Sequence, residues 1–171
     1  MAIISTPRLT LSLFKFSDWS FFQRLRECPA VMRYLGDIAP AKDTRLLFAR
    51  RLAAQHTFVI RDHNTSTPLG DIGLQLSPLY THEADLGYAI LPEAQGKGIA
   101  SEAVTAVCQY AFERTDVMAI NAYALAENKG SVRILEKTGF VRTQVLEKAY
   151  EIDGIAYDDW VFRLERDALK L

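Results

Sequence analysis

A glycine-containing loop lies between an apolar run and a segment with helical periodicity, and its composition suits it to binding an anion. The loop is Gln95-Gly96-Lys97-Gly98-Ile99-Ala100, and it follows Pro92. Glycine can adopt positive φ and lets a ligand approach the main chain closely. The N–H groups at the start of the expected helix favour an anion such as a pyrophosphate, and Lys97 adds a positive charge. A tight turn without a ligand is the alternative for the loop taken alone.

The loop does not match two common nucleotide-binding motifs. The Walker A sequence G-x-x-x-x-G-K-[ST] is absent, and the dinucleotide motif G-x-G-x-x-G fails because Ser101 stands at its third glycine position. The loop therefore predicts a phosphate site of another kind.

Two carboxylates precede the loop and are candidates for acid–base chemistry. Glu83 and Asp85 stand at the start of an expected strand, and their spacing places both side chains on one face of it. Either carboxylate could take a proton from a substrate amine through a bridging water. A solvated, acidic strand end is the alternative.

A second polar pair, Asn128 and Ser131, opens another expected helix. These residues could contact a ligand. They could also be an ordinary helix N-cap and a first-turn serine.

The hydrophobic pattern predicts a mixed sheet whose strands are first paired locally and then crossed by helices. We expect a helix near Ser17–Glu27 with Ser17 as its cap, and an antiparallel hairpin turning at Asp153-Gly154. Further helices are expected near 43–55, after Gly98 and over 128–139, and the tally is about seven strands and about four helices. The predicted strands cover residues 8–14, 57–62, 68–76, 84–91, 118–125, 140–152 and 158–165. The predicted class is therefore α+β, a mixed α/β fold.

Composition narrows the class of protein. The chain has 171 residues, a formal net charge of −1, two cysteines and three histidines. A general nucleic-acid binder needs a basic surface, and a metal site needs clustered ligands; neither pattern occurs, so we expect no nucleic-acid partner and no metal. No run approaches the ~18 apolar residues of a membrane span. We expect one domain over residues 1–171, in the cytoplasm and away from membranes.

The motifs together resemble the GCN5-related N-acetyltransferase (GNAT) superfamily, in its RimJ/RimL-type branch of ribosomal-protein N-terminal acetyltransferases. The Q-x-x-G-x-A loop at Gln95–Ala100 resembles the acyl-CoA pyrophosphate loop of that family. About thirty residues later comes N-x-x-S-x-x-x-L-E-K-x-G-F, beginning at Asn128. The resemblance extends over essentially the whole chain, from TPRLTL to the final Asp-Gly hairpin.

This resemblance implies acetyl-CoA as co-substrate and a sheet splayed between its fourth and fifth strands, where the pantetheine arm enters. It implies cofactor contacts from the main chain of Tyr88, Ala89 and Ile90, and from the loop residues. Asn128 and Ser131 match positions that meet the pantetheine arm and the sulfur. Asp85 falls where the family often has a carboxylate, with Glu83 beside it. The residues implied to contact the cofactor are Tyr88, Ala89, Ile90, Gln95, Gly96, Lys97, Gly98, Ile99, Ala100, Asn128 and Ser131.

One family feature is missing. Many members have a tyrosine seven residues after the asparagine, as the acid that protonates the departing thiolate, but here that position is Leu135. The RimL-like pattern suggests Ser131 in its place. The implied catalytic residues are therefore Asp85, Glu83 and Ser131.

The resemblance implies acetyl transfer to a primary amine, foremost the N-terminal α-amine of a ribosomal protein. A small amine such as a polyamine, an amino acid or an aminoglycoside is the alternative acceptor. A non-catalytic acyl-CoA-binding module and a ligand-free structural protein are further alternatives, and a homodimer is open.

Overall fold

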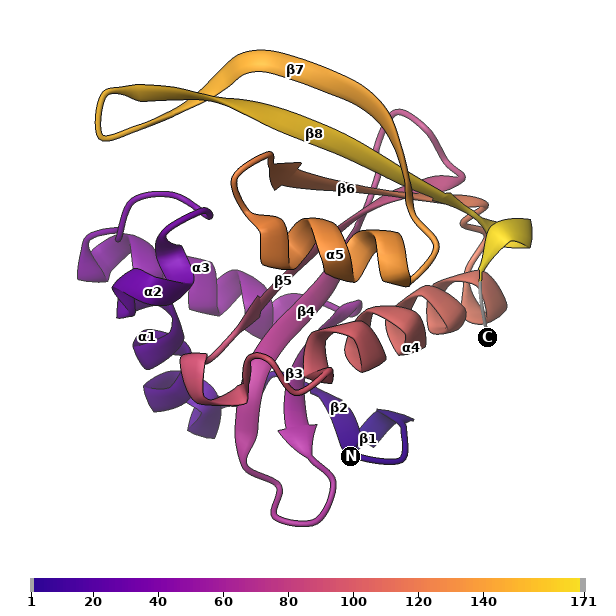
Figure 1. The fold of residues 1–171 in the computed structure, drawn as a ribbon. Coiled ribbons are helices and arrows are strands. Elements are labelled where there is room, and N and C mark those ends of the chain that lie inside the picture. Colours follow the sequence, from indigo (N-terminus) through magenta and orange to yellow (C-terminus); the bar gives the residue numbers. More distant parts are fainter. Residues whose placement is uncertain (1, 170–171) are drawn as a thin grey trace. The chain divides into compact units, whose positions relative to one another are not determined.

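The computed structural model describes residues 2–169 and contains one eight-stranded sheet with the order β1-β2-β3-β4-β5-β6-β8-β7 (Figure 1). The strands are β1 Ala2–Ser5, β2 Leu9–Leu13, β3 Thr57–Asp62, β4 Pro68–Leu76, β5 Glu83–Ile90, β6 Ala119–Leu125, β7 Val141–Ile152 and β8 Ile155–Glu165. The α-helices are α1 Trp19–Glu27, α2 Pro29–Met32, α3 Ala41–Ala53, α4 Ile99–Arg114 and α5 Lys129–Lys137, and the 3-10 helices are η1 Phe16–Asp18, η2 Pro92–Ala94 and η3 Arg166–Ala168.

The predicted mixed α/β class is confirmed, with one more strand and one more α-helix than expected. The additional strand is β1, which has four residues and pairs antiparallel with β2. The additional helix is α2, a single turn with Pro29 in its first position. Both are too short to produce a periodic hydrophobic pattern, which explains why the sequence did not indicate them.

The β5–β6 pair is parallel, and its register runs from Glu83↔Ala119 to Leu86↔Ala122. The pairs β2–β3, β3–β4, β6–β8 and β7–β8 are antiparallel. At the β7–β8 turn Asp153 and Gly154 have φ of 51° and 77°, as the predicted hairpin requires.

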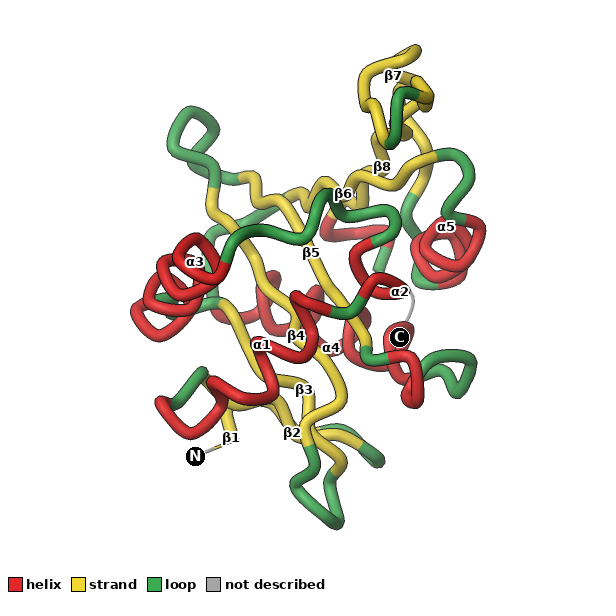
Figure 2. Tube along the Cα trace, turned by 90° about the vertical axis from the view of Figure 1, so that its left-hand side faces the viewer, coloured by secondary structure: helices red, strands yellow, loops and turns green. Residues whose placement is uncertain are grey.

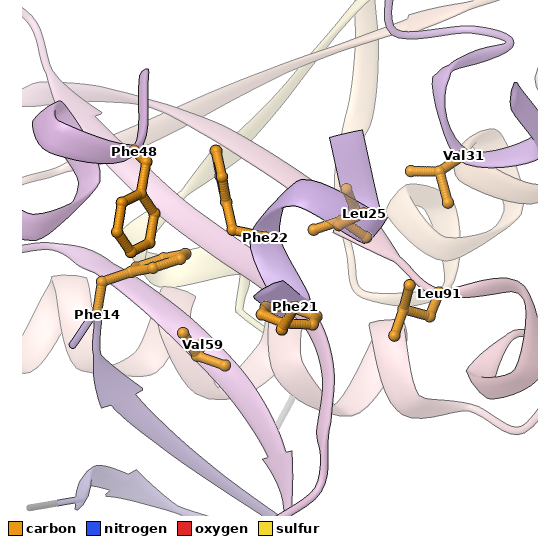
Figure 3. Packing of buried hydrophobic residues seen from close by; sticks show 9 residues of the cluster. Phe14, Phe21, Phe22, Leu25, Val31, Phe48, Val59 and Leu91 are labelled. Atoms are coloured by element: carbon orange, nitrogen blue, oxygen red, sulfur yellow. The ribbon is translucent and has the colours of Figure 1, made fainter. Parts of the chain in front are cut away.

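The chain forms two compact units. The first contains residues 1–73 and 88–103, and the second contains residues 74–87 and 104–171. In the first unit, apolar residues of α1 and α3 pack against Phe14, which directly follows β2, and against Val59 of β3. Figure 2 shows these helices in red and the strands in yellow. The cluster consists of Phe14, Phe21, Phe22, Leu25, Val31, Phe48, Val59, Ala89 and Leu91 (Figure 3).

Ser17 does not cap α1, because the chain enters that helix through η1. Asp18 lies at the junction and is only 4% exposed. Its carboxylate accepts hydrogen bonds from Lys15 N at 2.9 Å and from Arg61 Nη2 at 2.5 Å. A buried ion pair with β3 therefore fixes the start of the helix, in place of a serine cap.

The second unit has its own buried residues, among them Leu86, Ile120, Leu135, Phe162 and Leu164. In helix α5, Gly139 follows the C-cap with φ of 102°, and Phe140 N donates to Leu135 O at 3.0 Å. A glycine in the left-handed conformation therefore ends this helix, at the last residue of the predicted range 128–139.

Candidate active site

The Gln95–Ala100 loop connects η2 to α4, and its geometry suits an anion. Gly96 and Gly98 have φ of 72° and 76°, in the left-handed region that favours glycine. The first main-chain bond of α4 runs from Glu102 N to Gly98 O at 3.1 Å. The N–H groups of Ile99, Ala100 and Ser101 therefore have no carbonyl partner within the helix and face its open end. The predicted positive-φ loop before a helix N-terminus is confirmed.

Two side chains of the loop bond to the main chain just before it. Gln95 Nε2 donates to Ile90 O at 2.9 Å, and Lys97 Nζ donates to Glu93 O at 2.9 Å. Gln95 thereby joins the loop to the Tyr88–Ile90 segment of β5. Gln95 thus positions the loop, and the bond to Glu93 O keeps the charged end of Lys97 close to the loop.

Arg8 also positions the loop, and the sequence analysis did not single it out. Arg8 Nη1 donates to Lys97 O at 2.8 Å, while Arg8 Nε donates to Glu102 Oε2 at 2.6 Å. Thr6 Oγ1 donates to Glu102 Oε1 at 2.6 Å. The only signal for Arg8 in the sequence was its place in the TPRLTL segment, because the bond joins residues 89 positions apart.

Glu83 and Asp85 lie on the paired part of β5, in the second unit. Asp85 is exposed between the buried residues Ala84 and Leu86. It is in register with Asn121 of β6, which is in turn in register with Arg163 of β8. Side chains in register share one face of a sheet. A polar row therefore crosses three strands at this point.

Glu83 lies beside this row and is hydrogen-bonded to two of its members. Its carboxylate accepts from Asn121 Nδ2 at 3.0 Å and from Arg163 Nη1 at 3.0 Å. The hydrogen bond from Asn121, and then that from Arg163, lower the pKa of Glu83. Glu83 is therefore held in its ionised form and is a poor proton acceptor.

Asp85 has the opposite electrostatic environment. Partial burial, together with the negative charge of Glu83, raises the pKa of Asp85 above its usual value, against a hydrogen bond from Asn121. A carboxylate with a raised pKa is the better base of the two. The sequence left Glu83 and Asp85 equivalent, and the structure distinguishes them.

Two further groups lie near this row and were not singled out as catalytic candidates. Tyr123 of β6 is half exposed, and burial followed by the charges of Asp85, Asp159 and Glu83 raises its pKa. Burial also raises the pKa of Asp159 on β8. Tyr123 and Asp159 add an aromatic and an acidic side chain to the face of β6 and β8 that carries the polar row.

Asn128 is the N-cap of α5, where its Oδ1 accepts from Ser131 N at 3.2 Å. Both residues are half-buried. Leu135 is fully buried in the second unit, at the position where many family members have tyrosine. The cap interpretation of Asn128 is therefore confirmed.

The predicted site residues fall in both units. The first unit brings Tyr88–Ile90 together with the Gln95–Ala100 loop, and the second unit brings Glu83 together with Asp85 and Asn128 together with Ser131. Over residues 2–169, no group of three His, Cys, Asp or Glu side chains could hold a metal ion. None of the helices in that range is long and apolar enough to span a membrane.

Curated relatives include N-acetyltransferases from Bacillus subtilis (strain 168). The chain is 31% identical to the uncharacterized N-acetyltransferase YoaA over 105 residues, which is 61% of this chain and 59% of that protein. It is 25% identical to the uncharacterized N-acetyltransferase YnaD over 165 residues, covering 94% of this chain and 95% of that protein.

Solved structures share the fold. A GNAT-family acetyltransferase from Bacillus anthracis superposes with a TM-score of 0.86 at 25% identity, covering 96% of this chain and 98% of that one. A spermidine N-acetyltransferase from Vibrio cholerae, in complex with CoA and spermine, gives a TM-score of 0.85 at 23% identity, covering 95% and 98%.

A family model matches most of the sequence. It is described as the acetyltransferase (GNAT) domain, and it covers residues 8–141. The match includes the loop, the carboxylates of β5 and the Asn128 helix. The chain therefore belongs to the GNAT family of acetyltransferases and is an acetyl-transferring enzyme.

Proposed function

We propose that this protein transfers an acetyl group from acetyl-CoA to a primary amine, foremost the N-terminal α-amine of a protein. The observation that carries the proposal is the left-handed Gly96/Gly98 loop at the N-terminus of α4. A Cβ built on Gly96 would meet no atom within 4 Å, so the requirement for glycine there is conformational and not steric. Such a loop presents main-chain N–H groups to a diphosphate.

The other cofactor contacts follow the family resemblance. The main chain of Tyr88, Ala89 and Ile90 pairs with the amides of the pantetheine arm, and a strand N–H in this segment donates to the thioester oxygen. Asn128 contacts the arm, and Ser131 donates a hydrogen bond to the sulfur. Gly96, Lys97, Gly98, Ile99 and Ala100 hold the diphosphate, and Gln95 holds the loop in place.

Asp85 acts as the general base of the proposed reaction. It accepts a proton from the substrate ammonium through a water, and the neutral amine then attacks the thioester carbonyl. Glu83 stays ionised between Asn121 and Arg163 and raises the basicity of Asp85. As the C–S bond breaks, the departing thiolate takes up the second proton lost by the amine nitrogen. It needs little help, because a thiol with pKa ~8.5 lies only ~1.5 units above neutral pH.

An α-amine is the acceptor that such a site can use most easily. At pH 7 an α-amino group with pKa ~7.8 is about a tenth neutral, while a lysine with pKa ~10.4 is neutral to a few parts in ten thousand, a gap of roughly 3.5 kcal/mol. This favours an N-terminal α-amine as the acceptor; the choice of a ribosomal-protein N-terminus follows from the RimJ/RimL-type resemblance alone. The same proposal places the enzyme in the cytoplasm. It also has the enzyme act as one domain over residues 1–171 and assemble as a homodimer.

Two assays test this function. Coenzyme A at 100 times its Kd should stabilise the protein by ~2.7 kcal/mol, which a rise in melting temperature would reveal. Release of thiol from acetyl-CoA should then depend on an acceptor, with N-terminal peptides, amino acids, polyamines and aminoglycosides as the panel. Stabilisation without thiol release would indicate a binding module, and no stabilisation would contradict the proposal.

Removing the Arg8 side chain should weaken coenzyme A binding about fivefold. Arg8→Ala removes the hydrogen bond to Lys97 O that holds the loop, and a bond of this kind contributes about 1 kcal/mol. Calorimetric titration of coenzyme A measures the effect. The control is Arg24→Ala, because Arg24 pairs with Glu93 near the loop while both side chains remain more than half exposed, at 58% and 57%. Equal affinities for the two variants would show that Arg8 does not position the loop.

A further inference from the structure

Two arginines of the first unit share one buried aspartate. Arg26 of α1 donates from Nη2 to Asp71 Oδ2 at 2.6 Å, and Arg51 of α3 places Nε 4.0 Å from the same oxygen. The Asp71 side chain is 3% exposed, the Arg26 side chain 13% and the Arg51 side chain 29%. The group is therefore mostly removed from water, and Arg51 forms its accessible side.

This arrangement carries one positive charge more than its carboxylate neutralises. A guanidinium stays protonated in proteins, so the three side chains have a net charge of +1. Burial, and then repulsion from Arg26, lower the pKa of Arg51 despite the attraction of Asp71. Buried charges in proteins are normally paired, so a second anion would stabilise this group by neutralising its excess positive charge.

The hydrogen bonding of the group is also incomplete. Among the described residues, Nε of Arg26 and Nε of Arg51 are both buried without a hydrogen-bond partner. The large majority of buried polar side-chain atoms have one, so two such donors on neighbouring guanidiniums need a cause. An acceptor with two oxygens, such as a carboxylate, matches the geometry of guanidinium donors.

Strand β4 links the group to the segment proposed to hold the thioester. Gly70, which precedes Asp71 on β4, has no side chain, and a Cβ there would lie 2.3 Å from Ala89 O. Arg26 lies over the ring of Phe22 at 5.2 Å, and Phe22 and Ala89 belong to the same buried cluster. Asp71, which binds both arginines, therefore directly follows the residue at which β4 meets the main chain of Ala89.

We propose that Arg26 and Arg51 together bind a carboxylate of the acceptor, so that the acceptor is an α-amine with a carboxylate close to it. This inference rests on the proposed acetyl transfer. Two sources supply that chemistry, a free amino acid and a peptide whose first residue is Asp or Glu. A polyamine or an aminoglycoside does not.

Paired acceptors test the inference by the presence or absence of the carboxylate. The first arm compares L-methionine with L-methioninamide, and the second compares a peptide that starts with Glu with the same peptide starting with Gln. In one arm, kcat/KM should be about tenfold or more higher for the acceptor with the carboxylate than for its partner without it. Hydrogen bonds between charged groups contribute enough free energy for a difference of this size. L-methioninamide is a strict comparison, because its amine is less basic than that of L-methionine and a larger fraction of it is neutral. If the carboxylate had no role, L-methioninamide would therefore be the better acceptor. The arm that shows the preference identifies the source.

Arg51→Gln should abolish this preference, and Arg50→Gln should keep it, because Arg50 is the exposed neighbour on the same helix. Stability provides a second readout. Removing an excess positive charge should leave the melting temperature of Arg51→Gln unchanged or raised, whereas Arg26→Gln should lower it by unpairing Asp71. Coenzyme A should stabilise Arg51→Gln and wild type equally.

A test without turnover separates this inference from the proposed function. Acetate, compared with chloride at equal ionic strength, should raise the melting temperature of the wild type and of Arg50→Gln but not of Arg51→Gln. An equal response of all three proteins to acetate, or equal kcat/KM for both members of each acceptor pair, would overturn the carboxylate site. A failure of coenzyme A to bind would instead contradict the acetyl-transfer proposal.

Discussion

Asp85→Asn is expected to lower kcat/KM for acetyl transfer by about 10²–10⁴-fold, the usual contribution of a general base. The substitution keeps the size of the side chain and removes its ability to accept a proton. Because Asp85 is exposed and its pKa is raised, the loss should appear in turnover and not in folding. Steady-state kinetics over a range of acceptor concentrations measure kcat/KM, and the melting temperature of the variant reports on folding.

Glu83→Gln is the matched control, and the pH profile tells the two carboxylates apart. The wild-type kcat/KM should fall at acidic pH as Asp85 becomes protonated, and this fall should occur at a higher pH than for an ordinary aspartate because the pKa of Asp85 is raised. Glu83 contributes to that rise through its negative charge, so removing it lowers the pKa of Asp85. The acidic limb of Glu83→Gln should therefore move to lower pH, with activity largely retained.

The same experiment can refute the assignment. Full activity in Asp85→Asn, with a large loss in Glu83→Gln, would identify Glu83 as the base despite its bonds to Asn121 and Arg163. Intact activity in both variants would place the base elsewhere.

Phe22→Ala is expected to reduce the free energy of unfolding by about 3–5 kcal/mol, the usual cost of deleting a buried aromatic ring. Phe22 is fully buried, and its ring centre lies 5.8 Å from that of Phe14 and 5.4 Å from that of Phe48. Figure 3 shows these three side chains close together, with Phe14 just after β2, Phe22 on α1 and Phe48 on α3. Denaturant unfolding followed by far-UV circular dichroism measures the loss.

Phe16→Ala provides the comparison, because Phe16 belongs to the adjacent η1 and is 84% exposed. Its free energy of unfolding should stay within about 0.5 kcal/mol of wild type. Similar losses in the two variants would mean that the cluster around Phe22 does not hold the first unit together.

The sequence predicted the longer elements well because each carries its own periodicity. Strands β3 and β4 begin and end at the predicted residues, 57–62 and 68–76. The predicted start of α1 at Ser17 was wrong, because the helix start is fixed by the bond from Arg61 to Asp18, two residues that lie 43 positions apart. A local capping rule cannot anticipate a bond over that distance.

In the candidate site, too, features that depend on neighbouring residues were predictable and features that depend on distant contacts were not. Local spacing was sufficient for the positive φ of Gly96 and Gly98 and for the Asn128 cap, because both depend on neighbouring residues. The difference between Glu83 and Asp85 depends on Arg163, 80 positions from Glu83, and on the register of β8. The positioning of the loop by Arg8 is likewise a contact across the chain, which spacing alone does not reveal.

A crystal structure of the protein with bound coenzyme A tests the central claim most directly. The diphosphate should lie against the main-chain N–H groups of Gln95–Ala100, at the start of α4, with the pantetheine arm along Tyr88–Ile90. Density for the diphosphate at any other surface would contradict the account, as would a loop that stays empty at saturating coenzyme A.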